Sequence, residues 1–323
     1  MSAVAHRLLD VPAGRIHVAE QGSGPLVILV HGFPECWYSW RHQLPAIAEA
    51  GFHAVALDVR GYGRSSKPLA LDAYRVLDLA NDVAGVVAAI GADAATVIGH
   101  DWGSPIATAT ALAHPEIVHA VGTLSVPYAP RGGPRPTEIF ARIGGPEEFY
   151  VSYFQEPGRA EAEIEPDVRA WLAGFYAALS GEAEPPPDGG SVSFVAEGGR
   201  LRDRFPDLGP LPAWLSEDDL DVYAGEFERT GFTGALNRYR NMDRDWEDMA
   251  TWDGAPIAQP SIFIAGERDP TLGWMGGAIE AFGSTLPGLV GSHVLEGAGH
   301  WIQQERPAEV NRLLTDWLET VAD

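Results

Sequence analysis

Short apolar runs alternate with longer stretches of helical periodicity through the first 127 residues of the 323-residue chain. The segment PLVILVHG (25–32) is a continuous apolar run that ends in glycine, as expected of a strand buried on both faces. Helix-like stretches separate it from further apolar runs at 53–58, 95–101 and 119–127. Strands separated by helices of this length predict a parallel sheet with right-handed crossovers. The segment GRIHVAEQG (14–22) alternates in period two and adds an early hairpin strand.

The alternation stops after residue 127, and the chain up to residue 245 reads as mostly helical. A helix is expected to start at the N-cap Ser216 and to end near Gly231, and a biased loop covers 181–199. Strand patterns return at 261–269 and 292–300. The remaining predicted helices lie at about 39–50, 75–91, 103–114 and 306–320. We therefore predict an α/β core made of 1–127 and 246–323, with a helical cap of 128–245 inserted after the sixth strand.

Composition excludes several classes of partner. The net charge of −23 and the single lysine disfavour nucleic acid and anionic membrane, because a phosphate backbone would repel the chain. No run of 18 apolar residues predicts a membrane span, and the N-terminus lacks a secretory pattern. The only cysteine, Cys36, excludes an internal disulfide, so the cytoplasm is the expected location. Whether the protein is a monomer or a homodimer stays open.

Four loops that follow predicted strands carry the reactive side chains. They are HGFP (31–34), GHDWGS (99–104) with Asp101, GERD (266–269) with Asp269, and GAGHW (297–301) with His300. Catalytic groups of open parallel sheets lie on such loops. The order nucleophile, acid, histidine is that of the α/β-hydrolase fold, in which the middle residue of the small-x-nucleophile-x-small turn attacks the substrate.

Aspartate at that position changes the chemistry. A lone aspartate before a helix is usually an N-cap, but the three other loops favour a nucleophile. Asp101 is already an anion, and it attacks a saturated carbon to give an ester intermediate better than it attacks a carbonyl. His300 would then activate a water that hydrolyses the ester, and Asp269 would orient its imidazole, although Glu267 is a nearby alternative acid. The backbone N–H groups of Phe33 and Trp102 are predicted to bind the oxyanion.

The other histidines have no comparable setting. His31 and His100 flank the site but read as backbone-shaping residues, and no histidine pair has metal-ligand spacing with a cysteine or carboxylate. We expect no metal and no cofactor.

The segment HGFPECWYSWRHQLPAIAEAGFHAVALDVRGYGRSS (31–66), with GHDWGS (99–104) and GHWIQQERPAEVNRLLTDWL (299–318), resembles the soluble epoxide hydrolases of the α/β-hydrolase fold. The resemblance runs nearly end to end. It implies hydrolysis of a small-molecule epoxide by water to a vicinal diol, without a cofactor.

The resemblance also implies two cap tyrosines that bind the epoxide oxygen and protonate the departing alkoxide. FYVSYFQEPG (149–158) puts the first at Tyr150, with Tyr153 as the alternative, and GALNRYRNM (234–242) puts the second at Tyr239. Phe33, Trp102 and Tyr153 are the candidate pocket residues.

The chain departs from the family pattern at two positions. Cys36 replaces a serine, and Arg238 replaces a tryptophan beside Tyr239, where it could change the charge of the pocket or point to solvent. Two other functions share part of this pattern. A haloalkane or haloacid dehalogenase shares the aspartate nucleophile but needs N–H donors for halide, such as the Trp102 indole, and no acid. A ligand-binding protein of this fold would need none of the catalytic residues.

Overall fold

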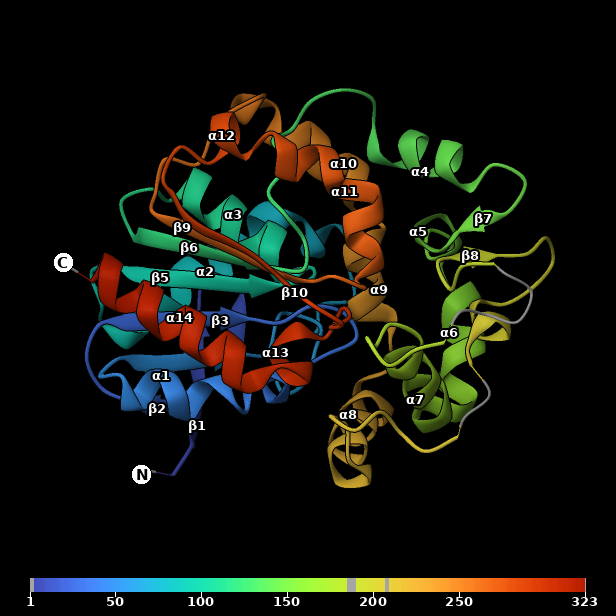
Figure 1. The fold of residues 1–323 in the computed structure, drawn as a ribbon, viewed down its shortest axis with the longest axis horizontal. Helices are drawn as coiled ribbons and strands as arrows, with labels where there is room; N and C mark the ends of the chain where they lie inside the picture. The colour runs from blue at the N-terminus through green and yellow to red at the C-terminus, as the bar shows by residue number, and fades with distance from the viewer. Residues whose placement is uncertain (1–2, 185–189, 207–208, 323) are drawn as a thin grey trace.

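Eight strands form one sheet in the computed structural model, which describes residues 3–184, 190–206 and 209–322 (Figure 1). The order across the sheet is β1-β2-β4-β3-β5-β6-β9-β10. The β1–β2 and β2–β4 pairs are antiparallel, and every other neighbouring pair is parallel. The strands are β1 (Ala5–Val11), β2 (Gly14–Gly22), β3 (Leu26–Val30), β4 (His53–Leu57), β5 (Ala95–His100), β6 (Val118–Leu124), β9 (Ser261–Gly266) and β10 (Leu289–Leu295). The predicted α/β class with a mostly parallel sheet is confirmed.

Helices cover both faces of the sheet, which explains the continuous apolar runs of its inner strands. In β3, Ile28 and Val30 belong to one buried cluster, whereas Val27 and Leu29 belong to the other. The first cluster includes side chains of α2 and α3, and the second includes side chains of α1 and α14. These helices are α1 (Gln43–Glu49), α2 (Val76–Ile90), α3 (Gly103–Ala113) and α14 (Pro307–Val321). A strand buried on both sides has no polar face to alternate with.

The chain between β6 and β9 forms most of a separate group of helices beside the sheet (Figure 1). Its elements are α4 (Pro136–Gly144), β7 (Glu148–Phe149), α5 (Tyr150–Tyr153), α6 (Arg159–Ile164), α7 (Val168–Ala178), β8 (Phe194–Val195), α8 (Glu217–Thr230), α9 (Thr233–Tyr239) and α10 (Met242–Asp248). The segment is mostly helical, as predicted, but β7 and β8 add a two-stranded antiparallel sheet. The 181–199 loop contributes β8, and its residues 185–189 lie outside the described residues.

Helix α8 shows how local sequence fixes the ends of these elements. The Ser216 hydroxyl accepts the Asp219 N–H, and Gly231 ends the helix with φ of 68°. Both ends agree with the prediction. The boundaries at 127 and 245 stay a prediction, because the larger buried cluster includes core residues such as Val121 and inserted residues such as Trp171.

The last elements follow β9 and complete the site. They are α11 (Pro270–Glu280), α12 (Phe282–Thr285) and α13 (Ile302–Glu305). Short 3₁₀ helices lie earlier in the chain, at Trp37–Trp40, Leu71–Tyr74, Glu165–Asp167, Leu201–Arg204 and Met249–Trp252. None of the helices in the described part of the chain has both the length and the apolar content that a bilayer crossing requires.

Candidate active site

Asp101 stands at a sharp turn between β5 and α3. Its backbone has φ of 50°, a left-handed conformation that is unusual for a residue other than glycine. The turn needs glycine on both sides: a Cβ on Gly99 would lie 2.0 Å from the Gly103 carbonyl oxygen, and one on Gly103 would lie 2.0 Å from the Val30 carbonyl oxygen. Backbone strain of this kind is concentrated at functional sites. The turn projects the Asp101 carboxylate beyond the end of β5.

The Asp101 carboxylate faces a hydrogen-bond donor on one side and a base on the other. The Phe33 N–H donates to Oδ1 over 2.7 Å, and His300 Nε2 lies 3.6 Å from Oδ2. Gly32 makes room for this approach, because a Cβ there would come within 2.3 Å of Oδ1. The backbone of the HGFP loop is therefore directed at the carboxylate.

His300 is held through its other ring nitrogen. Nδ1 lies 3.2 Å from each carboxylate oxygen of Asp269, which can only accept, so Nδ1 carries the proton and donates it. Burial by itself would lower the pKa of His300, but the charges and hydrogen bonds of Asp269 and Asp101 raise it well above 6.5. The free site therefore favours an imidazolium between two carboxylates.

Asp269 is fixed by the start of α11. It is the N-cap residue, accepts the Thr271 N–H over 2.9 Å and precedes Pro270 at the first helical position. Burial would raise the pKa of Asp269, but the charge and hydrogen bond of His300 bring it to about 2. The alternative acid Glu267 instead accepts the exposed Gly297 N–H over 3.0 Å. The structure thus brings Asp269, rather than Glu267, to His300.

Tyr150 and Tyr239 reach the same cavity from the inserted segment. Tyr150 starts α5 and Tyr239 ends α9, and their ring centres are 6.1 Å apart. Burial raises the pKa of both phenols, as does the charge of Asp101, so both keep their protons at neutral pH. Two neutral O–H donors therefore lie across the cavity from the carboxylate.

Tyr153 does not reach the cavity, so its prediction as a pocket residue is wrong. Its hydroxyl donates to Glu163 over 2.6 Å, and its buried ring is not part of the cavity wall. Glu163 also accepts the Trp171 indole N–H over 2.9 Å, so Tyr153 belongs to a buried polar cluster of the inserted segment.

The Trp102 side chain does not line the cavity either, which corrects that prediction too. Its ring packs edge-on against Tyr239, with 4.9 Å between centres, and the Arg238 guanidinium lies 4.5 Å above it. Arg238 is buried in an ion pair with Asp245. It therefore neither adds a free charge to the cavity nor points to solvent.

The cavity is small and its wall is mostly apolar, with a free volume of about 30 Å³. Sequence reasoning found five of its wall residues: Phe33, Asp101, Tyr150, Tyr239 and His300. It missed the others, which are Phe175, Leu179, Val192, Ser193, Pro270, Thr271 and Trp274. Of these, only Pro270 and Thr271 had a signal, since they directly follow the candidate acid.

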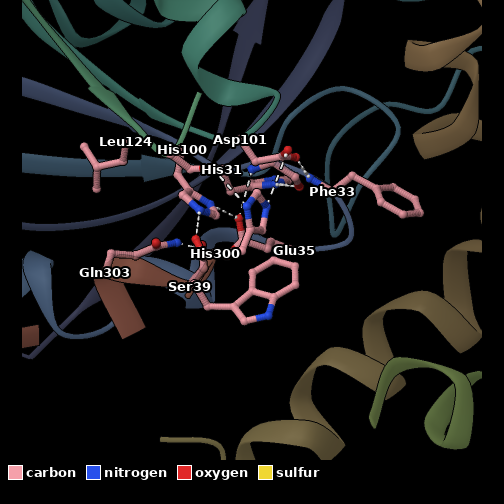
Figure 2. Close-up of polar contacts among 12 residues, drawn as sticks. His31, Phe33, Glu35, Ser39, His100, Asp101, Leu124, His300 and Gln303 are labelled. Carbon is pink, nitrogen blue, oxygen red and sulfur yellow. Dashed lines mark hydrogen bonds and ion pairs between the residues drawn. The ribbon is translucent and has the colours of Figure 1, made fainter. Parts of the chain in front are cut away.

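A buried polar cluster supports the loop that carries His300 (Figure 2). His100 lies 2.8 Å from a Glu35 oxygen through Nδ1 and 2.8 Å from the His300 carbonyl oxygen through Nε2. Glu35 also accepts the Gly32 N–H and both Gln303 and Gln304 amides over 3.0–3.1 Å. Burial would raise the pKa of Glu35, but His100 lowers it. No sequence signal pointed to Glu35.

His31 shapes the HGFP loop, as predicted. Its Nδ1 lies 2.8 Å from the Gly32 carbonyl oxygen, and its Nε2 accepts the Val59 N–H over 3.0 Å. The ring therefore ties the loop that carries the Phe33 N–H to the chain that follows β4.

A further set of bonds ties the inserted segment to the catalytic loop. The His300 N–H donates to the Leu179 carbonyl over 2.9 Å. The Glu305 carboxylate accepts the N–H groups of Gly181 and Gly299 over 2.9 Å each and that of Trp301 over 3.1 Å. Residues 179–181 are therefore hydrogen-bonded to the loop that holds the histidine and to the Glu305 carboxylate beside it.

Known proteins similar to this chain include epoxide hydrolases. The family model of the alpha/beta hydrolase fold matches residues 25–307. Epoxide hydrolase B of Mycobacterium tuberculosis is 42% identical, with 97% of this chain and 98% of that protein covered, and epoxide hydrolase A of the same species is 44% identical over 98% of both.

Solved structures agree. An epoxide hydrolase from an endophytic Streptomyces is 66% identical, covers 100% of this chain and 97% of its own, and has a TM-score of 0.97. Epoxide hydrolase A from Mycobacterium thermoresistibile is 44% identical over 98% of both chains, with a TM-score of 0.92.

Proposed function

The chain belongs to the epoxide hydrolases of the α/β-hydrolase fold, and from that premise we propose that Asp101 is the nucleophile and His300 the base of a two-step hydrolysis. The observation that carries the proposal is that one cavity is lined by the Asp101 carboxylate, the His300 imidazole and the hydroxyl-bearing Tyr150 and Tyr239.

In the first step, an Asp101 oxygen attacks an epoxide carbon and the C–O bond of the ring breaks. The electron pair of that bond goes to the epoxide oxygen, which takes a proton from Tyr150 or Tyr239. An alkoxide is a poor leaving group unless it is neutralised as it forms, and general acids of this kind accelerate reactions by about 10²–10⁴-fold. The product is an alkyl ester of Asp101.

In the second step, His300 removes a proton from water, and the resulting hydroxide adds to the carbonyl carbon of the Asp101 ester. The Phe33 N–H, already within 2.7 Å of the carboxylate, would stabilise the oxyanion together with the predicted Trp102 N–H. Collapse of this intermediate breaks the bond to the alkyl oxygen, which takes the proton held by His300, so the diol is released. The proton of the regenerated Asp101 carboxyl group returns to the tyrosinate formed in the first step, and this restores the Asp101 carboxylate.

The charge of Asp101 couples the two steps. In the free site this carboxylate helps to raise the pKa of His300. Esterification removes its negative charge, so the pKa of His300 falls and a larger fraction of the imidazole becomes available as a base. Alkylation thereby prepares the group that the second step needs, while Asp269 keeps the ring oriented.

The experiment is to trap the intermediate. His300→Gln should permit the first step and block the second, so incubation with styrene oxide should add the mass of one epoxide to the intact protein. Asp101→Asn is the matched control and should gain no mass. The proposal fails if His300→Gln shows no mass increase while Asp101→Asn still turns over styrene oxide.

The inserted segment has a defined part in this scheme. We propose that residues 128–245 act as a cap over the core of 1–127 and 246–323, because this segment carries both tyrosines.

Dehalogenation loses its main support, since the Trp102 indole lies outside the cavity wall. Release of halide from 1-bromobutane, with styrene oxide left untouched, would restore the dehalogenase alternative.

A cytoplasmic location remains proposed from the single cysteine, and cell fractionation tests it.

A further inference from the structure

Ser125 combines backbone strain with complete burial directly after β6. Its φ of 68° is in the left-handed region, and Asp101 is the only other residue besides glycine with a positive φ in the described part of the chain. Serine gains nothing from this conformation, which glycine adopts freely. Its side chain is fully buried, and its N–H donates to the Ile264 carbonyl over 2.9 Å. Backbone strain at a residue other than glycine therefore points to a role for the side chain.

The Ser125 hydroxyl lies between the acid and the base. Its Oγ is 2.9 Å from His300 Nδ1, whereas each Asp269 oxygen is 3.2 Å from the same nitrogen. The Ser125 hydroxyl also hydrogen-bonds the Asp269 carboxylate. Nδ1 carries a proton and Asp269 only accepts, so the directions of these bonds are fixed. Ser125 accepts from Nδ1–H and donates its own proton to Asp269.

We propose that Ser125 is a positioning residue for ester hydrolysis, whose hydroxyl joins Asp269 to His300 and keeps Nε2 of the imidazole directed at Asp101. The left-handed backbone at the end of β6 turns the hydroxyl into this position. The inference rests on the proposed role of His300 as the base of the second step.

The proposal assigns the effect to one step of the reaction. Asp101 attacks the epoxide without a base, so loss of the Ser125 hydroxyl leaves ester formation unchanged. Hydrolysis needs a correctly oriented imidazole, so it slows. A hydroxyl that only filled space would affect both steps equally or neither.

The experiment uses Ser125→Gly and Ser125→Ala in the full chain. Glycine removes the hydroxyl and suits the positive φ, so this variant keeps the experiment valid if alanine prevents folding. Thr110→Val is the matched control, because Thr110 is also buried but its hydroxyl donates only to the Ile106 carbonyl, over 2.7 Å. Rapid-quench mass spectrometry with styrene oxide measures the rates of adduct formation and decay.

In Ser125→Gly, we expect adduct formation at the wild-type rate and hydrolysis slowed about 10- to 100-fold, the range for loss of a hydrogen bond to a charged group. The alkyl-enzyme then accumulates at steady state, as it does not in Thr110→Val. Wild-type hydrolysis in Ser125→Gly, or equal slowing of both steps, overturns the inference. The His300→Gln variant separates the two proposals: if it accumulates adduct while Ser125→Gly behaves as wild type, only the role of Ser125 is wrong.

Discussion

Replacement of Asp245 by asparagine tests whether the buried Arg238–Asp245 pair holds the second tyrosine in place. Arg238 directly precedes Tyr239, and its guanidinium forms an ion pair with Asp245 while stacking on Trp102. Asp245 also accepts the Val76 N–H at the start of α2 over 2.7 Å. The pair thus connects α9 and α10 to a helix of the core.

The size of the effect follows from burial. The two side chains are 5% and 9% exposed, and removal of one partner from such a pair costs about 3–5 kcal/mol. The guanidinium stacks on Trp102 with or without Asp245, so this contact does not change the difference. Asparagine keeps an acceptor for the Val76 N–H, so no second loss is added. We expect Asp245→Asn to lower the free energy of unfolding by about 3–5 kcal/mol.

Arg238→Met should behave differently, because a carboxylate can take up a proton and a guanidinium cannot. Burial raises the pKa of Asp245 above 3.8, and Arg238 opposes this, so the pKa rises further when Arg238 is removed. A carboxyl group whose folded pKa is raised destabilises the protein at high pH and ceases to do so as pH falls through that pKa. The penalty of Arg238→Met is therefore smaller at pH 5 than at pH 8, whereas that of Asp245→Asn, which removes the titrating group, is not reduced at pH 5.

Urea unfolding followed by circular dichroism at the two pH values measures these differences. Asp316→Asn is the control, since its pair with Arg312 is 65% exposed on both sides and should contribute almost nothing. The reasoning is refuted if Asp245→Asn is no less stable than Asp316→Asn, or if the Arg238→Met penalty does not change with pH.

Three further predictions concern the cavity. Tyr239→Phe should slow adduct formation about 10²-fold or more and leave adduct hydrolysis nearly unchanged in single-turnover experiments, because only the first step needs an acid. Tyr153→Phe should leave both rates unchanged and lower the free energy of unfolding in urea by about 1–3 kcal/mol, because a buried Glu163 loses a donor. Esterified Asp101 no longer raises the pKa of His300, so His300 should have a lower pKa in the alkyl-enzyme than in the free enzyme. The pH at which the rate of ester hydrolysis falls should therefore be lower than the pKa of His300 measured by NMR in the free enzyme, and equal values would contradict this.

The sheet could be predicted because its inner strands are buried on both faces. β3 is apolar throughout and β4, β5 and β6 are apolar at most positions, and helices separate them. β1 was missed because most of its residues are exposed, so no apolar pattern marks it. β7 and β8 are two residues long each, which is too short for any periodicity.

The sequence predicted those site residues that lie in recognisable turns. Asp101, Asp269 and His300 each follow a strand within a short glycine-containing loop, and the structure brings them together. Ser125 and Glu35 carry no such signal, because their contacts join residues far apart in the chain. Tyr150 and Tyr153 are neighbours on α5, and only the contact of Tyr153 with Glu163, ten residues further along the chain, shows which of the two lines the cavity.

The bonds between residues 179–181 and the catalytic loop bear on whether the inserted segment is a transferable module. A graft of this segment from a relative would have to bring backbone groups that meet the His300 N–H and the Glu305 carboxylate. A chimera that breaks these bonds would leave the buried His300 N–H without an acceptor and take one of three N–H donors from the buried Glu305 carboxylate, next to the catalytic histidine. Recombination points are therefore better chosen outside 179–181, so that this stretch and the 297–305 region come from the same parent.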